Sequence, residues 1–173
     1  RAPSPLRYTR APMKQPLDPA RISLVVTTYN WPEALDLVLE SIARQTALPA
    51  EVLIADDGSA EGTARLVESW RSRFPVPLLH LWQEDLGFRA ARSRNRAIAA
   101  ASGDYIVMID GDMVLERHFI ADHAAAAEPG CFVQGVRLNT SPECSRRLVD
   151  RSLRRITPFT RGIGRAQHAV RSP

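Results

Sequence analysis

The residues best suited to chemistry are two aspartates separated by one glycine, Asp110-Gly111-Asp112. Carboxylate oxygens are hard ligands, and a pair of them can hold Mg²⁺ or Mn²⁺ while coordination positions stay open for phosphate oxygens. The tripeptide directly follows an apolar run of strand length, 105–109. A solvated acidic turn is the alternative, but the position just past a strand favours a divalent-cation site.

A second acidic cluster, Asp56-Asp57-Gly58-Ser59, follows another apolar run. Asp-Gly is a common turn dipeptide, and Ser59 is a candidate cap for the next helix. The functional interpretation is that one of the two aspartates accepts hydrogen bonds from a ligand, such as a base N–H or a ribose hydroxyl. The residues alone leave both interpretations open.

Two further side chains stand near expected strand ends. Tyr29 either lays its ring against a flat ligand or is a partly buried aromatic of the kind common at such positions. Arg89 begins an Ala/Arg-rich helical segment, and an anionic ligand is favoured at a helix N-terminus. The arginines farther along that segment spread over different faces of a helical wheel, so we expect most of them in solvent: Arg92, Arg94 and Arg96.

An alternation of strand and helix patterns must position these clusters. Runs of strand length occupy 22–28, 51–55, 78–82, 104–110 and 131–136. Helical spacing predicts helices after Asn30, which is a candidate cap, and over 63–73, 89–101 and 115–127. Alternating elements need crossover connections, so we predict an α/β fold with a largely parallel sheet flanked by helices. Ligands bind such sheets beyond the carboxyl ends of the strands, where the polar clusters fall.

The charge of the chain is unevenly distributed. The 173 residues carry a net charge of +4, and the pI of about 9.7 is typical of a nucleic-acid binder. However, residues 1–20 hold four basic and one acidic side chain, residues 137–173 hold nine and two, and residues 21–136 hold ten and sixteen. The basic character therefore flanks an acidic core, and we expect no nucleic-acid partner. No apolar run is long enough to span a membrane.

Other site types find little support. Cys131 and Cys144 fit no zinc or redox spacing, so we expect two reduced thiols, one of them buried in a strand. His118 and His123 are five residues apart, the wrong spacing for a shared metal on a helix, and are expected at the surface. The phosphate-loop, dinucleotide-binding and nucleophile-elbow patterns are absent from the sequence.

Taken in order, the clusters resemble those of family 2 glycosyltransferases of the GT-A fold, which are inverting enzymes that use nucleotide sugars. The matching segments are 25–30 (VVTTYN), 55–59 (ADDGS), 83–88 with 91–97, and 109–112. The match covers about residues 20–137 and is most similar to bacterial members that build lipopolysaccharide or other surface polysaccharides. It implies a Rossmann-like fold for nucleotide-diphospho-sugar transfer.

The resemblance also implies roles for the matching positions. The nucleotide-binding residues would be Thr27, Tyr29, Asp57, Arg89 and Asp110. Within this set, Thr27 and Tyr29 would line the uridine pocket, and Asp57 would bind the base. Asp110 would face the ribose and the metal, and Asp112 would be the metal ligand, with Mn²⁺ or Mg²⁺ bridging the diphosphate.

The chain departs from the family pattern after this point. Family members continue into a segment that binds the acceptor and supplies a carboxylate general base. The later carboxylates of this chain lie in no recognisable motif: Glu116, Asp122, Glu128, Glu143 and Asp150. We therefore expect an irregular proline-rich arm over 1–20, a nucleotide-sugar-binding core over 21–137, and a basic tail over 138–173 with a candidate helix over 146–156. The general base stays unassigned.

The leading hypothesis is a family 2 transferase that moves a sugar from a UDP-type donor to a saccharide or lipid-linked acceptor in bacterial surface polysaccharide synthesis. The alternative is an incomplete nucleotide-sugar-binding fragment without the acceptor half and the general base. A third interpretation is weak attraction of the basic tail to an anionic membrane surface. We expect a cytoplasmic protein, peripheral at the inner membrane face if the tail acts in this way.

Overall fold

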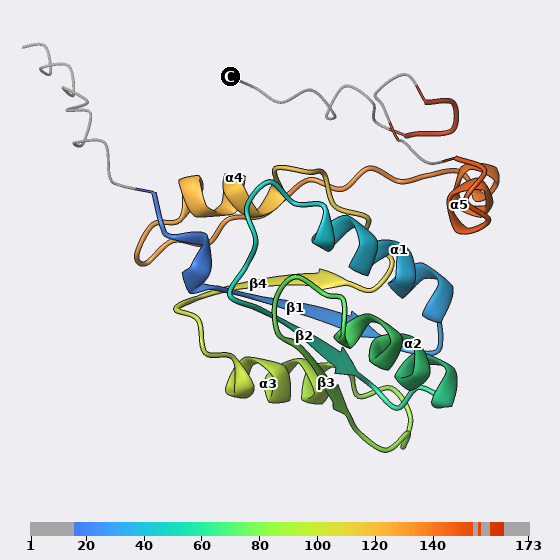
Figure 1. The fold of residues 1–173 in the computed structure, drawn as a ribbon, viewed down its shortest axis with the longest axis horizontal. Helices are drawn as coiled ribbons and strands as arrows, with labels where there is room; N and C mark the ends of the chain where they lie inside the picture. Colours follow the sequence, from blue (N-terminus) through green and yellow to red (C-terminus); the bar gives the residue numbers. More distant parts are fainter. Residues whose placement is uncertain (1–15, 154–155, 157–159, 165–173) are drawn as a thin grey trace, which may run out of the picture.

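The computed structural model describes residues 16–153, 156 and 160–164, so most of the predicted arm and part of the predicted tail lie outside the described residues. The fold is a sheet with helices on both faces (Figure 1). The strands are β1 (Ile22–Thr28), β2 (Glu51–Asp56), β3 (Leu78–Trp82) and β4 (Tyr105–Asp110). Their order is β3-β2-β1-β4 and every pairing is parallel. The predicted α/β architecture is confirmed.

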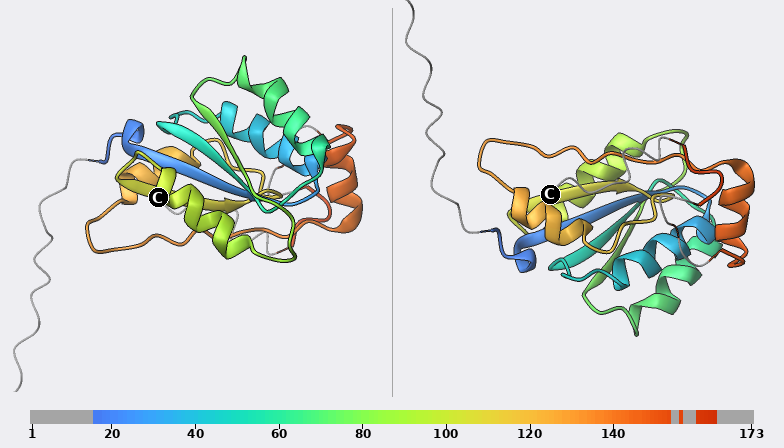
Figure 2. Two further views of the ribbon diagram at one scale, coloured as in Figure 1. Left: turned by 90° about the horizontal axis from the view of Figure 1, so that it is seen from below. Right: turned by 90° about the horizontal axis from the view of Figure 1, so that it is seen from above.

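Three helices cover one face of the sheet and one covers the other (Figures 1 and 2). The first three are α1 (Pro32–Ala43), α2 (Glu61–Arg71) and α4 (Phe119–Ala126), and the fourth is α3 (Ala90–Ala100). In α1, Pro32 stands in the first turn, where its missing N–H costs nothing. The four apolar residues that follow at helical spacing are all fully buried: Leu35, Val38, Leu39 and Ile42.

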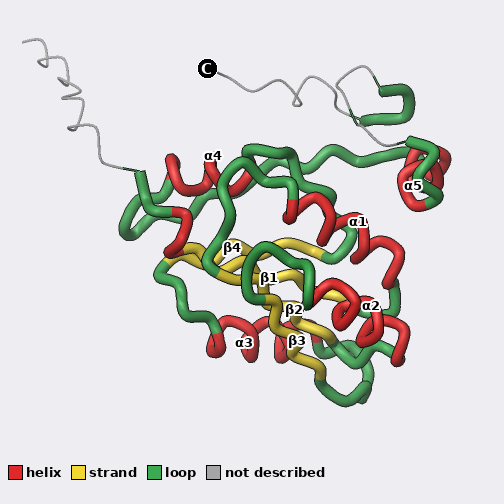
Figure 3. The backbone as a smooth tube through the Cα atoms, viewed as in Figure 1, coloured by secondary structure: helices red, strands yellow, loops and turns green. Residues whose placement is uncertain are grey.

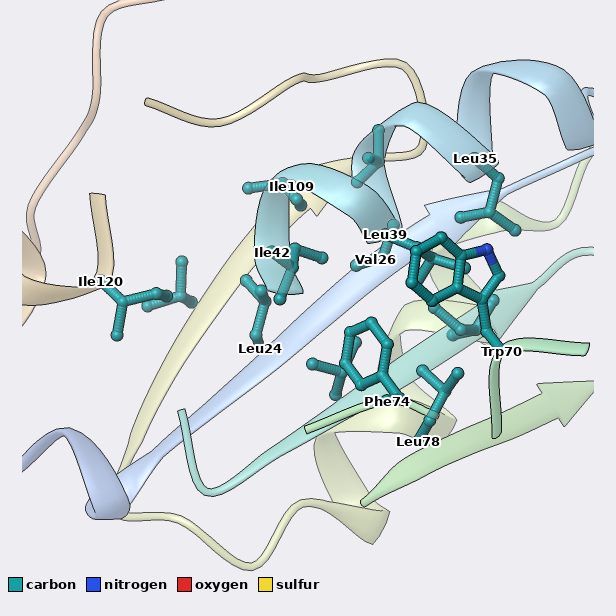
Figure 4. Packing of buried hydrophobic residues seen from close by; sticks show 14 of the residues in the cluster. Leu24, Val26, Leu35, Leu39, Ile42, Trp70, Phe74, Leu78, Ile109 and Ile120 are labelled. Atoms are coloured by element: carbon teal, nitrogen blue, oxygen red, sulfur yellow. The ribbon is translucent and has the colours of Figure 1, made fainter. Parts of the chain in front are cut away.

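The main core lies between the sheet and the α1, α2 and α4 face, where Leu24 and Val26 of β1 meet Leu39 and Ile42 (Figure 4). Alternate residues of the same strands point to the α3 face. There a smaller cluster forms around Val25, Leu53, Ala55 and Ala97. Within the described residues, no helix is both long and apolar enough to cross a membrane.

The fifth predicted strand is wrong. Residues 131–136 lie in the loop that runs from α4 to α5 (Pro142–Val149) (Figure 3), and Phe132 is 89% exposed. A strand pattern forms a strand only where it finds a partner and a surface to cover, and within the described residues this segment pairs with none. Cys131 is therefore exposed, and the buried thiol is Cys144, in a helix.

Two capping predictions are also wrong. The residue before α1 is Trp31, without a side-chain cap. Asn30 adopts a left-handed conformation, and its side chain accepts a hydrogen bond from the Ala60 N–H at the start of α2 (2.7 Å). Ser59 caps no helix, because its hydroxyl accepts from the Asn30 N–H instead (2.9 Å). These contacts join the turn after β1 to the turn after β2.

Two further segments differ from the prediction in where their regular structure lies. The helix expected over 146–156 is α5, capped by Ser141 and ending at Val149. In the predicted arm, residues 19–21 form a 3₁₀ turn, and Leu17 packs on the main core.

His123 is buried instead of lying at the surface, with its Nδ1 3.1 Å from the Tyr105 hydroxyl. Burial lowers the pKa of His123 below its ordinary value.

Candidate nucleotide-sugar site

The parallel register brings the polar clusters to one edge of the sheet. Thr27 pairs with Ala55 of β2 on one side and with Asp110 of β4 on the other, and Thr28 pairs with Asp56. A cavity of about 320 Å³ opens at this edge, within the usual size range of small-molecule sites. Its lining residues are Thr27, Thr28, Tyr29, Ala55, Asp57, Gly87, Phe88, Ala90, Arg94 and Asp110.

Asp56 and Asp57 are neighbours in sequence, but only Asp57 lines the cavity, and Asp56 bonds to the backbone of the turn. Asp56 is fully buried and accepts hydrogen bonds from the N–H groups of Gly58 (3.2 Å) and Ser59 (2.8 Å). His80 Nε2 also lies 2.8 Å from its Oδ2. Burial raises the pKa of Asp56, but the hydrogen bonds from His80 and Ser59 outweigh it, and the net pKa is lowered. Asp56 therefore closes the turn, and of the two only Asp57 lines the cavity.

Asp57 is held in place by two donors. Gln83 Nε2 donates to its Oδ1 (2.6 Å), and the Arg89 backbone N–H donates to its Oδ2 (2.8 Å). Arg89 thus touches the site through its main chain, while its guanidinium donates to the Glu84 carbonyl and does not line the cavity. The two bonds orient a buried carboxylate whose oxygens each keep a further lone pair for a ligand.

The loop over 84–88 closes one side of the cavity. Tyr29, about half exposed, donates from its hydroxyl to Asp85 Oδ2 (2.9 Å). The hydrogen bond and negative charge of Asp85 raise the pKa of Tyr29. The loop can approach because Gly58 has no side chain: a Cβ there would lie 2.6 Å from the Asp85 Cα, and the φ of +101° also favours glycine.

Asp110 forms ion pairs with two arginines, Arg94 and Arg137. Its Oδ1 accepts from Thr27 Oγ1 (3.1 Å) and from an Arg94 Nη (3.0 Å), and Arg137 Nη1 lies 3.7 Å from its Oδ2. Thr27 and Asp110, both predicted, are thereby brought together. Gly111 allows β4 to end close to β1, since a Cβ there would lie 2.6 Å from the Thr27 carbonyl oxygen.

Arg94 is the residue that sequence reasoning missed. It was expected in solvent, because a helical wheel spreads the arginines over different faces and the face that packs on the sheet was not identified. Ala90, Arg94 and Ala97 stand at i, i+4 and i+7 of α3, which is the stripe that faces the sheet. Small residues on both sides of an arginine in a buried stripe were the available signal.

Asp112 lies beyond β4 and is exposed. In the part of the chain that the structure describes, no three His, Cys, Asp or Glu side chains gather into a metal site. Asp110 and Asp112 supply two carboxylates, which suffices for Mg²⁺ or Mn²⁺ only where phosphate oxygens and water complete the shell. The residues fit a cation that binds together with a diphosphate.

A sequence model described as glycosyl transferase family 2 matches residues 23–169. The chain belongs to this family. Validoxylamine A glucosyltransferase of Streptomyces hygroscopicus subsp. limoneus is 35% identical over 107 residues, which are 61% of this chain and 23% of that protein. Hyaluronan synthase of Pasteurella multocida is 33% identical over 93 residues, which are 53% of this chain and 9% of that protein. The chain thus spans a quarter or less of these relatives.

Solved structures show the same fold. S. aureus TarS 1-349, in complex with UDP-GlcNAc, superimposes with a TM-score of 0.51 at 29% identity, covering 61% of this chain and 30% of TarS 1-349. A mannosyltransferase from Pyrobaculum calidifontis, in complex with GDP-Man and Mn²⁺, gives a TM-score of 0.56 at 23% identity, over 80% of this chain and 42% of its own. The expected GT-A fold is confirmed.

Proposed function

We propose that the chain is the nucleotide-sugar-binding part of a glycosyltransferase, and that the cavity at the ends of β1, β2 and β4 binds the nucleoside diphosphate of a UDP-type donor. One observation carries the proposal. A single cavity of about 320 Å³ presents an aromatic ring, a buried oriented carboxylate and a guanidinium, in Tyr29, Asp57 and Arg94. The UDP-GlcNAc complex of TarS supports the choice of donor.

The base end of the donor would lie between the turns after β1 and β2. Tyr29 would stack its ring on the base, and Thr27 lines the same cavity. The Asp57 carboxylate, oriented by Gln83 and the Arg89 N–H, would accept the base N–H. Since Asp57 is only 5% exposed, a hydrogen bond to it would form in a region with little competing water.

The diphosphate end would lie at β4. Arg94 and Arg137 both contact Asp110, so fixed positive charge already stands beside this carboxylate. Asp112, with Asp110, would hold Mn²⁺ or Mg²⁺, which when bound neutralises the charge that develops on the leaving diphosphate. The Pyrobaculum structure with Mn²⁺ gives the precedent in the fold. We further propose inverting transfer to a saccharide or lipid-linked acceptor in bacterial surface polysaccharide synthesis.

Calorimetric titration of UDP, with and without Mn²⁺, tests the proposal. We expect binding that Mn²⁺ strengthens, at least tenfold weaker binding in Asp57→Asn, and loss of the Mn²⁺ effect in Asp112→Asn. The matched control is Asp104→Asn, an exposed carboxylate just before β4 that is paired with Arg21 and should leave UDP binding unchanged. A folded chain that does not bind UDP, or that binds it equally well as Asp57→Asn, contradicts the proposal.

Binding without turnover is a second candidate function. Among the residues described, the carboxylates that line the cavity are Asp57 and Asp110, and both already accept hydrogen bonds. In the proposed function Asp57 accepts from the base and Asp110 helps to hold the cation, so neither is assigned to take a proton from an acceptor hydroxyl. Release of sugar from UDP-GlcNAc by the purified chain would exclude this candidate, and tight UDP binding without any release would favour it.

A further inference from the structure

The loop over 84–88 carries an aromatic side chain to which the proposed function gives no role. Phe88 lines the donor cavity together with Tyr29. It is also 95% exposed, so almost nothing among the described residues covers either face of its ring. Exposure alone means little, because single exposed apolar side chains are common at protein surfaces. What sets Phe88 apart is that its uncovered ring belongs to the wall of a cavity.

The backbone places Phe88 beside the carboxylate of Asp57. The Arg89 N–H donates to Asp57 Oδ2 at a distance of 2.8 Å. That N–H belongs to the peptide unit that joins Phe88 to Arg89, so the Phe88 carbonyl carbon lies within about 4 Å of the same carboxylate oxygen. A phenylalanine ring extends farther than this from its own backbone. The Phe88 ring is therefore within reach of a base that donates to Asp57.

Hydrogen bonds fix both ends of the loop while the Phe88 ring stays uncovered. At one end, Asp85 accepts from the Tyr29 hydroxyl at Oδ2 (2.9 Å) and from the Gly87 N–H at Oδ1 (3.1 Å). The other end is held by the backbone hydrogen bond to Asp57. The loop backbone is thus ordered in advance, and a ligand that covers the ring has little more than its two side-chain torsions to immobilise.

This arrangement suits one part of a nucleotide. Tyr29 and Phe88 bring two aromatic rings to one cavity of about 320 Å³, in which Asp57 is an oriented hydrogen-bond acceptor. A nucleobase has flat faces that stack on aromatic rings and an N–H edge that donates to a carboxylate. A phosphate gains no hydrogen bond and no opposite charge from a phenyl ring. The base is therefore the part of the donor that Phe88 fits.

We propose that Phe88 is a second base-stacking residue of the donor cavity, in addition to Tyr29. This inference rests on the proposed function, because the base belongs to the donor nucleotide. Stacking would remove from water the apolar ring surface that Phe88 now exposes, and this burial is the source of its contribution to affinity. The contribution concerns the base alone, so binding of the diphosphate and the cation at β4 does not depend on Phe88.

Calorimetric titration of the full chain with UDP and with inorganic pyrophosphate, each with Mn²⁺, tests the assignment, because pyrophosphate carries the two phosphates without the base. In Phe88→Ala we expect about tenfold weaker UDP binding, the usual cost of removing an aromatic side chain from a base stack, and an unchanged pyrophosphate affinity. Phe88→Trp should retain UDP affinity. The matched control is Leu86→Ala, which removes a 63% exposed side chain of the same loop that does not line the cavity.

NMR of bound UDP gives a readout that a merely structural role of Phe88 would not move. With Mg²⁺ in place of the paramagnetic Mn²⁺, stacked aromatic rings shift the two ring protons of uracil upfield. The shift should shrink in Phe88→Leu, which keeps apolar bulk without the ring, and persist in Phe88→Trp. Because Tyr29 also contributes a ring, part of the shift should remain in Phe88→Leu.

The outcomes separate this inference from the proposed function. If the unmodified chain binds UDP and Phe88→Ala binds it equally well, the stacking role is overturned and the donor site stands. An equal loss of UDP and pyrophosphate binding in Phe88→Ala, or an equal loss of UDP binding in Leu86→Ala, also overturns it. An unmodified chain that binds no UDP overturns the proposed function and the role of Phe88 together.

Discussion

The two faces of the sheet are built from the same four strands but for different purposes. On the α1, α2 and α4 face, large side chains such as Leu24, Leu39 and Ile54 fill a continuous core. On the α3 face, the helix contributes small residues, and its apolar cluster is centred on Val25, Leu53 and Ala97. The thin layer leaves room for a cavity at the strand ends, where Ala90 and Arg94 of α3 form part of the wall.

The difference shows how one short chain can be stable and still keep a polar site. The face covered by α1, α2 and α4 is the thick face, and the face covered by α3 is the thin face. Burial on the thick face supplies most of the favourable free energy, because large apolar side chains remove the most surface from water. The thin face can then carry the partly exposed Arg94 and the hydrogen bond from Gln83 to Asp57 without unfolding the protein. Substitutions on each face test this division.

The largest expected effect is on the thick face. Leu39→Ala removes a fully buried side chain from the main core and should lower the free energy of unfolding by about 2–5 kcal/mol. Leu81→Ala, a half-buried leucine on the α3 face, should cost less. Urea denaturation of both variants provides the measurement. A larger loss for Leu81→Ala would reverse the comparison between the faces.

The next effect concerns binding at the thin face. Arg94→Gln removes a cavity-lining cation, and a hydrogen bond between such a cation and a diphosphate would be worth about 1.5–3 kcal/mol, so UDP affinity should fall at least tenfold. Arg137→Gln should reduce it less, because its guanidinium is two-thirds exposed and 3.7 Å from Asp110. Calorimetry with UDP ranks the two, and equal losses would contradict the assignment of Arg94.

A backbone change should affect both stability and binding. Gly58→Ala forces a Cβ against the backbone of Asp85 and strains a positive φ, at a cost of about 1–3 kcal/mol. Because the 84–88 loop must move, UDP affinity should fall as well. Gly130→Ala is the matched control: its φ is also positive, at 77°, but a Cβ there meets nothing within 4 Å. Thermal unfolding and UDP titration are measured for each variant. A larger loss in Gly58→Ala than in Gly130→Ala shows that displacing the loop over 84–88 costs more than the backbone strain alone.

The smallest effect is a pH dependence of the thick face. Burial lowers the pKa of His123, so the unfolded chain binds its proton more readily than the folded one. Its contribution is absent well above pH 6.5, the ordinary histidine value, and stability is lost as the pH falls from there toward the lowered pKa. Denaturation midpoints between pH 5 and 8 should show this slope, and His123→Gln should flatten it.

Most of the fold was predictable because β1 to β4 are strong apolar runs, and alternation with helices leaves few topologies. The same reasoning failed for residues 131–136, since an apolar pattern does not specify a partner strand. Asn30 was misassigned because its partner, the Ala60 N–H, is thirty residues away. Arg94 was missed because the helical wheel spread the arginines over several faces without showing which face of α3 packs on the sheet. The local patterns were readable, and the contacts between turns were not.

The link between the two turns has a consequence for the shape of the donor cavity. The Asp57 N–H donates to the Thr28 carbonyl (3.1 Å), and Asn30 bonds to both Ser59 and Ala60. Hydrogen bonds therefore join the turn after β1 to the turn after β2, and these turns are the two walls that would hold a base. The distance between them follows from the spacing of the neighbouring strands β1 and β2. Under the proposed function, a larger base would meet two walls held at a fixed separation and would extend toward the loop over 84–88, of which Gly87 and Phe88 line the cavity. Discrimination between pyrimidine and purine donors would then be decided by that loop.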